Sequence, residues 1–299
     1  MRIFLTGGSG YIGSAVLDAF VRAGHQVDAL VRNSEKAAVV QARGGHPVFG
    51  DLSEPATYAD ASAAADGVVH TASEASPRRV TVDAAALGAF LIPSKQPGRF
   101  VIYTSGIWVL GNCPSPADET APLNPLELVK WRPAHEQQVL NAATAGIRTI
   151  VIRPGVVYGG SRGMVGDIFK DAANSLVRVI GSGGNHWPLV YDRDLADLYV
   201  RVATNQGASG VFHANDEGDE RVNDLVAAIG SHAKTSPSVR YVPLAEARKK
   251  MGPYADALAV DQIVRSPRAR ELGWNPSLHS VAGNAARLFE EWRRGKEAA

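Results

Sequence analysis

The chain has 299 residues, and its 31 Lys and Arg nearly balance its 30 Asp and Glu, without a long run of one charge, which argues against nucleic acid or an anionic membrane as a partner. The single cysteine, Cys113, excludes an internal disulfide framework or a thiolate zinc cluster and fits a reducing compartment. There is no apolar stretch of roughly 18 residues and no signal-peptide pattern at the start, so we expect a cytoplasmic protein without a membrane-spanning helix.

A glycine-rich turn separates the first predicted strand, residues 3–5, from a helix whose apolar residues recur at helical spacing. Gly7 permits the tight turn, Gly10 lets the backbone approach a diphosphate, and Gly13 lets the helix pack closely on the strand. The N–H groups at the start of such a helix attract phosphate. The sequence therefore predicts a dinucleotide-binding unit at the N-terminus.

Strands and helices alternate through the first 155 residues, which predicts a doubly wound parallel α/β sheet of the Rossmann type. The predicted strands are 3–5, 26–31, 46–49, 67–72, 99–104 and 149–152. The predicted helices after the first are 35–43, 55–64, 80–91 and 132–145. A proline-rich segment, 113–125, is expected to be a loop.

The regularity weakens after Arg153-Pro154-Gly155. The pattern then predicts helices at 165–174, 192–203, 222–229 and 278–294, strands at 210–213 and 239–242, and a turn at 181–184. We expect these pieces to form a smaller, discontinuous C-terminal lobe over the carboxyl ends of the strands, where ligands bind in such sheets. The predicted domains are a dinucleotide-binding domain over 1–160 with parts of 189–215, and a substrate-binding lobe mainly over 161–299.

The end of the second strand predicts which dinucleotide binds, because it lies beside the adenosine ribose in this fold. An acidic residue there favours NAD, but this chain has Arg32, with Lys36 nearby. A guanidinium binds a phosphate through two hydrogen bonds. We therefore predict NADP(H) as the cofactor, with NAD(H) as second choice. The alternative interpretation is that Arg32 is a solvated surface charge.

Seven segments, in order along nearly the whole chain, resemble the extended short-chain dehydrogenase/reductase superfamily, often called NAD-dependent epimerase/dehydratases. They are 6–13, 50–52, 70–72, 103–105 with Gly111, 153–159, 189–196 and 269–276. Together with the glycine turn and Arg32, the resemblance implies a nicotinamide nucleotide site. Its expected residues are Gly7, Gly10, Tyr11, Ile12, Gly13, Arg32, Asp51, Leu52, Thr71, Ala72, Thr104 and Arg132.

The resemblance is weaker at the catalytic residues. Members normally move protons with a Tyr-x-x-x-Lys pair and a Ser or Thr. Counting back from Glu136 places Leu128 at the tyrosine position and Arg132 at the lysine position, while Gly106 takes the Ser/Thr position. Leucine has no proton to transfer, and arginine stays charged near neutral pH. The resemblance is therefore to atypical members that keep the cofactor fold without this pair.

Three other residues are candidates for a catalytic role. Ser105 either hydrogen-bonds a substrate carbonyl or holds the strand end. Tyr158 either faces the nicotinamide or packs as a buried tyrosine. His186, in a glycine-rich turn, titrates near neutral pH, although a lone loop histidine is more often a surface residue.

Two further sets of residues were weighed. Trp108, Trp131 and Trp187 either form an apolar substrate wall or pack in the ordinary way. The eight histidines are scattered without the spacing of metal ligands, so no metal is predicted.

The first functional hypothesis is an NADP(H)-dependent oxidoreductase acting on a small or medium, partly apolar carbonyl or alcohol, with a non-standard proton donor. A second is a non-catalytic NADP(H)-binding sensor or scaffold protein. A third is a nucleotide-sugar epimerase or dehydratase. The expected partner is a small-molecule substrate, and the protein is expected to be a monomer or, as is common in the resembling family, a homodimer.

Overall fold

The computed structural model describes residues 1–92, 98–233 and 235–297. The chain forms two compact units. Unit 1 comprises Met1–Ser105, Trp131–Arg153 and Ala196–Phe212, and unit 2 comprises Gly106–Lys130, Pro154–Leu195 and His213–Ala299. Within the described residues, no helix combines the length and the apolar character needed to cross a membrane.

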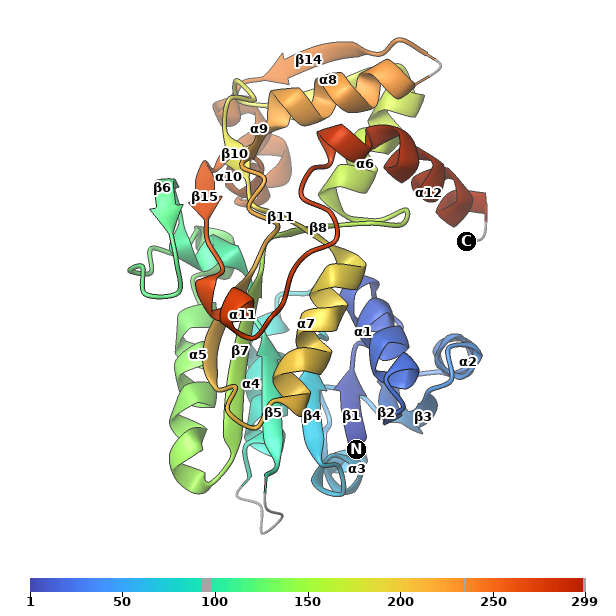
Figure 1. The fold of residues 1–299 in the computed structure, drawn as a ribbon, viewed down its shortest axis with the longest axis vertical. Helices are drawn as coiled ribbons and strands as arrows, with labels where there is room; N and C mark the ends of the chain where they lie inside the picture. Colours follow the sequence, from blue (N-terminus) through green and yellow to red (C-terminus); the bar gives the residue numbers. More distant parts are fainter. Residues whose placement is uncertain (93–97, 234, 298–299) are drawn as a thin grey trace. The chain divides into compact units, whose positions relative to one another are not determined.

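A seven-stranded sheet, in the order β12-β7-β5-β4-β1-β2-β3, forms the centre of unit 1 in the described part of the chain (Figure 1). Its strands are β1 (Arg2–Thr6), β2 (Gln26–Val31), β3 (His46–Phe49), β4 (Gly67–His70), β5 (Phe100–Thr104), β7 (Arg148–Pro154) and β12 (Gly210–Ala214). The pairs that join β3, β2, β1, β4, β5 and β7 are all parallel. The strand order changes direction at β1, as in a doubly wound sheet. The predicted fold class is therefore confirmed.

Helices connect these parallel strands. They are α1 (Tyr11–Arg22), α2 (Ser34–Ala42), α3 (Ala59–Ala63), α4 (Arg79–Phe90), α5 (Arg132–Asn141) and α7 (Asp192–Thr204), with short 3₁₀ turns η1 (Pro55–Thr57) and η4 (Ala142–Ala145). The predicted helix over 55–64 is divided at Tyr58, between η1 and α3. The side chains of Ile3, Phe4 and Leu5 are fully buried, as expected for a central strand that is covered on both faces.

Short ladders and a helical core make up the described part of unit 2. The strands are β6 (Cys113–Ala117), β8 (Val156–Tyr158), β9 (Leu176–Ile180), β10 (His186–Trp187), β11 (Leu189–Tyr191), β13 (Glu220–Arg221), β14 (Ser238–Val242) and β15 (Gln262–Val264). The helices are α6 (Gly163–Ala173), α8 (Val222–His232), α9 (Leu244–Met251), α10 (Tyr254–Ala259), α11 (Pro267–Glu271) and α12 (Ala285–Glu297), with 3₁₀ turns η2 (Ile107–Leu110), η3 (Glu127–Val129) and η5 (Ala282–Asn284). The pairs β8–β11, β9–β14 and β6–β15 are parallel, and β10–β13 is antiparallel.

The core of unit 2 lies between α6, α8 and α12, which contact one another. Phe169 of α6, Leu225 of α8 and Leu288 of α12 belong to the same buried cluster. These helices come from distant parts of the sequence, so the cluster forms only when the whole lobe is assembled.

Two predicted elements of this unit are wrong. The helix expected over 278–294 starts later, as the 3₁₀ turn η5 from Ala282 that continues into α12 at Ala285. The carboxylate of Glu220 accepts hydrogen bonds from the Ser280 hydroxyl and from the backbone N–H groups of Val281 and Ala282, and so caps this start. The apolar side chains of this segment are buried nonetheless, and they include Leu278, Val281, Leu288 and Trp292.

The segment 113–125 was expected to be a loop, but its first part forms strand β6. The prolines of β6 fit a strand that pairs along one edge only, since a proline has no N–H to donate. The partner is β15.

Candidate functional site

The turn between β1 and α1 has room only for glycine at its critical positions. Gly7 has a φ of +77°, and a Cβ at Gly13 would lie 2.0 Å from the Gly7 carbonyl oxygen. Gly10 precedes α1 without a side-chain cap, and no acidic residue lies in the first turn. The start of α1 therefore offers its N–H groups and its partial positive charge to an anion.

This turn forms part of a cleft of about 530 Å³ that lies within unit 1. Most of the residues predicted to contact the cofactor line it: Gly7, Gly10, Tyr11, Ile12, Gly13, Arg32, Asp51, Leu52, Thr71 and Ala72. Four residues outside the predicted set also line it: Ser9, Ser73, Glu74 and Ala75. Ser9 lies inside the recognised segment 6–13, and the other three directly follow the segment 70–72, so extending that segment by three residues would have found them.

Positive charge lies at the end of β2. Arg32 and Lys36 line the cleft, and Arg32 is exposed, with no hydrogen bond or ion pair to any residue that the structure describes. Asn33 fixes the local backbone, because its side chain accepts a hydrogen bond from the Lys36 N–H at the start of α2. The carboxylate of Asp28 is buried and accepts from Arg2 Nε at 2.5 Å, so it is already occupied.

Asp51 lies in the same cleft after β3. One of its carboxylate oxygens accepts hydrogen bonds from the Ser53 N–H, at 2.8 Å, and the Ser53 hydroxyl, at 2.7 Å. These hydrogen bonds lower the pKa of Asp51. The ionised carboxylate therefore stays oriented, with an oxygen left to accept from a ligand amine.

Thr104 and Arg132 do not line this cleft, but they contact each other at the end of β5. Arg132 Nη1 donates to the Thr104 carbonyl oxygen at 2.8 Å and to the Tyr103 hydroxyl at 3.3 Å. The Thr104 hydroxyl is 2.6 Å from the Tyr199 hydroxyl. Ser105 is only 7% exposed, and its Oγ has no hydrogen-bond partner among the described residues. A buried hydroxyl without a partner is costly, so Ser105 is suited to hydrogen-bond a ligand.

Tyr158 and His186, the other predicted catalytic residues, lie in unit 2, and both are already paired. The buried Tyr158 hydroxyl donates to Asp216 at 3.3 Å; burial, followed by the charge of Asp216, raises the pKa of Tyr158. His186 lies in strand β10 rather than in a turn. Its Nδ1 is 2.8 Å from Asp261 and its Nε2 accepts from Arg221 at 3.3 Å. A catalytic role for either residue remains a prediction.

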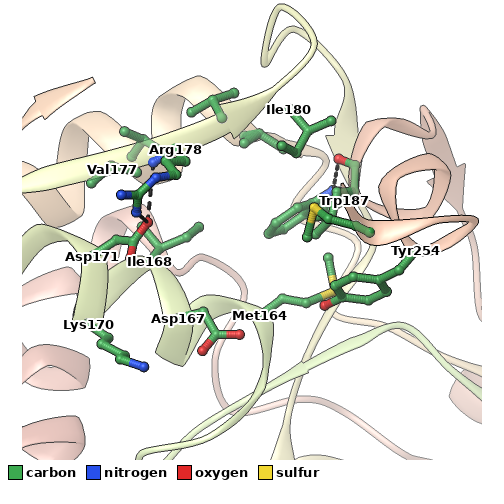
Figure 2. A pocket seen from close by; sticks show the side chains of 15 residues that line it. Met164, Asp167, Ile168, Lys170, Asp171, Val177, Arg178, Ile180, Trp187 and Tyr254 are labelled. Atoms are coloured by element: carbon green, nitrogen blue, oxygen red, sulfur yellow. Dashed lines mark hydrogen bonds and ion pairs between the residues drawn. The ribbon is translucent and has the colours of Figure 1, made fainter. Parts of the chain in front are cut away.

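A second cavity, of about 250 Å³, lies within unit 2 (Figure 2). Its apolar lining residues are Met164, Ile168, Val177, Val179, Ile180, Trp187, Val222, Val226, Met251 and Leu258, and its polar ones are Asp167, Lys170, Asp171, Arg178 and Tyr254. Arg178 forms an ion pair with Asp171, and the Trp187 indole N–H donates to the Leu258 carbonyl oxygen. Because most of the lining residues are apolar and Arg178 is paired, the walls favour an apolar ligand.

The three tryptophans have different surroundings. Trp187 lines the unit 2 cavity, whereas Trp108 makes an edge contact with Tyr254. Trp131, in unit 1, lies under the Arg132 guanidinium at 4.6 Å. Among the residues that the structure describes, no group of three or more His, Cys, Asp or Glu side chains is arranged to hold a metal ion.

Comparisons with known proteins agree with this architecture. Residues 3–214 match the NAD dependent epimerase/dehydratase family. The chain is 32% identical over 295 residues to an uncharacterized protein of Schizosaccharomyces pombe, covering 94% of this chain and 96% of that protein. It is 29% identical over 260 residues to a 2-alkyl-3-oxoalkanoate reductase of Stenotrophomonas maltophilia, covering 77% and 76%. The crystal structure of Thermus thermophilus UDP-glucose 4-epimerase in complex with NAD superposes with a TM-score of 0.77 at 19% identity, covering 98% of this chain and 99% of that one.

The chain therefore belongs to the NAD dependent epimerase/dehydratase family, within the extended short-chain dehydrogenase/reductase superfamily, as the ordered segments predicted.

Proposed function

We propose that this protein is an NADP(H)-dependent oxidoreductase acting on a small or medium, partly apolar carbonyl or alcohol. Family membership supports a nicotinamide cofactor. The observation that carries the choice of NADP(H) is the exposed Arg32 guanidinium in the unit 1 cleft, beside Lys36, while Asp28, the acid of β2, is already paired with Arg2.

In this proposal, the start of α1 binds the diphosphate, Asp51 accepts from the adenine amine, and Arg32 with Lys36 binds the 2′-phosphate. Ser105 donates its unpaired hydroxyl to the substrate oxygen, and Arg132 binds ribose hydroxyls. The nicotinamide, when bound, supplies or accepts the hydride. Because Tyr158 and His186 are each held by a carboxylate, we favour water as the proton source.

The apolar cavity of unit 2 supports an apolar substrate group. At about 250 Å³ it is larger than the roughly 150 Å³ apolar cavity that suffices to bind benzene. The similarity to a 2-alkyl-3-oxoalkanoate reductase points to the same substrate class, a carbonyl compound with alkyl chains. The largely apolar lining disfavours a nucleotide sugar, because Arg178 is paired with Asp171 and only Lys170 is left to face its two phosphates.

The cofactor assignment is tested by fluorescence titration with NADPH and NADH. We expect NADPH to bind more tightly, and Arg32→Ala to weaken NADPH binding by about tenfold or more without changing NADH binding, because a charge-assisted bidentate contact is lost. Arg43→Ala is the matched control, since Arg43 follows α2 but pairs with Asp18 outside the cleft. Tighter NADH binding, or an unchanged preference in Arg32→Ala, would refute the assignment.

The reaction class is tested by incubating the protein with NADPH and a panel of 2-alkyl-3-oxo acids, simple ketones and UDP-glucose. Sustained NADPH oxidation with an apolar ketone is the expected result. Tight NADPH binding without turnover on any substrate would favour the sensor or scaffold alternative. Conversion of the nucleotide sugar would favour the epimerase or dehydratase alternative.

A further inference from the structure

A buried chain of hydrogen bonds starts at the wall of the nucleotide cleft. The backbone N–H of Ala72 donates to Thr6 Oγ1 at 3.3 Å, and Thr6 Oγ1 lies 2.6 Å from His70 Nδ1. His70 Nε2 in turn lies 3.2 Å from Asp83 Oδ1. Ala72 lines the cleft, while Thr6, His70 and Asp83 are all buried. The cleft wall is therefore connected to a carboxylate inside unit 1.

The chain continues from Asp83 to Arg132. Asp83 Oδ2 accepts from the Tyr103 hydroxyl at 2.9 Å and lies 2.7 Å from His135 Nδ1. The Tyr103 hydroxyl accepts from Arg132 Nη1, which also donates to the Thr104 carbonyl oxygen. Across residues 1–92, 98–233 and 235–297, the structure gives Nε and Nη2 of Arg132 no hydrogen-bond partner. The series of hydrogen bonds thus ends at the Arg132 guanidinium, whose Nε and Nη2 can still donate to a ligand.

Asp83 accepts hydrogen bonds from three side chains, and only an ionised carboxylate can accept from all three without a donor of its own. Burial raises the pKa of Asp83, but hydrogen bonds from His135 and His70, with the nearby charge of Arg132, outweigh burial and leave that pKa well below its usual value. The carboxylate therefore stays ionised and holds its donors at fixed positions.

His70 completes the chain as a neutral imidazole with its hydrogen on Nε2. In this assigned tautomer, Nε2–H donates to Asp83 and Nδ1 accepts from the Thr6 hydroxyl, which leaves the Thr6 oxygen free to accept from Ala72. Every hydrogen between Ala72 and Asp83 then has an acceptor. The position of Asp83 fixes the direction of the whole chain.

We propose that Asp83 is a positioning residue for the nicotinamide nucleotide: it fixes the Arg132 guanidinium through Tyr103, and the Ala72 backbone through His70 and Thr6. The inference rests on the proposed function, which supplies the ligand. A free arginine side chain loses rotamer entropy when it binds, whereas one held in place beforehand has already lost it. Asp83 therefore strengthens binding without touching the ligand.

The comparison with Asp28 separates this role from simple burial. Asp28 is 3% exposed and also lies in unit 1, but it pairs with Arg2 and Gln26, neither of which lines the cleft. Replacing either buried carboxylate lowers stability, although the donors to Asp83 are buried and those to Asp28 are exposed. Only the removal of Asp83 alters groups at the nucleotide site.

The test compares Asp83→Asn, Tyr103→Phe and the control Asp28→Asn. Fluorescence titration with NADPH should show about tenfold weaker binding for Asp83→Asn and several-fold weaker binding for Tyr103→Phe, with Asp28→Asn close to wild type. Thermal unfolding measures the stability cost of each variant separately. Tyr103→Phe removes one hydroxyl and keeps the ring, so it carries the test if Asp83→Asn does not fold.

A spectroscopic readout needs no cofactor. In Asp83→Asn the amide oxygen should stay with the two donors, Tyr103 and His135, and the amide NH₂ then faces His70. His70 must accept at Nε2, so its hydrogen moves to Nδ1, and ¹⁵N NMR of the ring nitrogens should record this tautomer change. Asp28→Asn should leave the His70 signals unchanged.

The outcomes distinguish the two proposals. If Asp83→Asn and Tyr103→Phe unfold more easily but bind NADPH as tightly as the wild type, Asp83 has a structural role only, and the proposed function stands. If the wild type binds neither NADPH nor NADH, the proposed function fails and the positioning role fails with it. An unchanged His70 tautomer in Asp83→Asn would also contradict the hydrogen bonds that link Asp83 through His70 to Thr6.

Discussion

The nucleotide cleft of unit 1 and the apolar cavity of unit 2 are constructed in different ways. The cleft is made by short segments at or just after the ends of β1, β2, β3 and β4. The cavity is made by side chains from α6, β9, β10, α8, α9 and α10, which are spread between residues 164 and 258. The cleft therefore depends on local chain geometry, and the cavity depends on tertiary packing. One added Cβ should destroy the first, whereas a change of polarity should impair the second.

The largest effect is expected for Gly13→Ala. A Cβ at this position would lie 2.0 Å from the Gly7 carbonyl oxygen and 2.6 Å from Thr71 Oγ1, so the turn and α1 must separate. NADPH affinity should fall by at least about a hundredfold, measured by fluorescence titration.

Gly88→Ala is the matched control, because Gly88 lies in α4 of the same unit and a Cβ there meets nothing within 4 Å. This variant should bind NADPH normally and be slightly more stable, since alanine favours a helix. If Gly13→Ala also bound NADPH normally, the cleft would not be the nucleotide site.

Buried aspartates give a second contrast between the units. Asp83 in unit 1 is held ionised by three donors, whereas Asp216 in unit 2 accepts only from the Gly218 N–H and the Tyr158 hydroxyl among the described residues. Burial, together with the negative charge of Glu220, raises the pKa of Asp216 to about 7. The folded chain therefore keeps this proton at pH values where the unfolded chain has lost it.

This difference makes the free energy of unfolding fall as pH rises from about 4 to about 7, because the folded state binds more protons in that range. We expect Asp216→Asn to remove roughly 2 to 4 kcal/mol of this decrease, measured by urea unfolding at several pH values. Asp83→Asn should have the opposite effect. The pKa of Asp83 is lowered in the folded state, so the wild type loses stability as the pH falls below about 4, and the variant should lose less of it. Parallel pH profiles for wild type and Asp216→Asn would show that this carboxyl does not titrate in the window.

A smaller effect is expected in the cavity. Met164→Gln places an amide in an apolar wall, so the KM for an apolar ketone should rise about tenfold while kcat stays nearly constant. Leu123→Gln is the control, because Leu123 is exposed in unit 2 and does not line the cavity. An unchanged KM in Met164→Gln would mean that the substrate does not use this cavity.

The same contrast explains what the sequence could predict. Short strand-forming runs bounded by turn residues predict strands, and those predicted at 26–31 and 46–49 coincide with β2 and β3. The predicted cofactor residues lie in short motifs next to strands, so Arg32 and Asp51, which line the cleft, could be proposed without knowledge of the fold.

The cavity could not be predicted in this way. Met164 and Leu258 are distant in the sequence, and only packing brings them to one wall. The hydrogen-bond network around Asp83 could not be predicted either, because a single aspartate in a helix gives no sign that its carboxylate will contact two histidines. The start of α12 was also predicted too early, because the sequence pattern gives no sign that Glu220 will bind the backbone N–H of Val281.

The pairing of β6 with β15 has a consequence for synthesis. The Asp261 N–H reaches Asn112 across 149 residues, and Val264 closes a small apolar cluster with Ile107 and Leu110. At about 5 to 20 residues per second, the ribosome synthesises the segment around Asp261 and Val264 roughly 7 to 30 s after the segment that contains Ile107 and Leu110. During this interval the apolar side chains of Ile107 and Leu110 are exposed on the nascent chain. A chaperone that binds exposed apolar segments would therefore bind there.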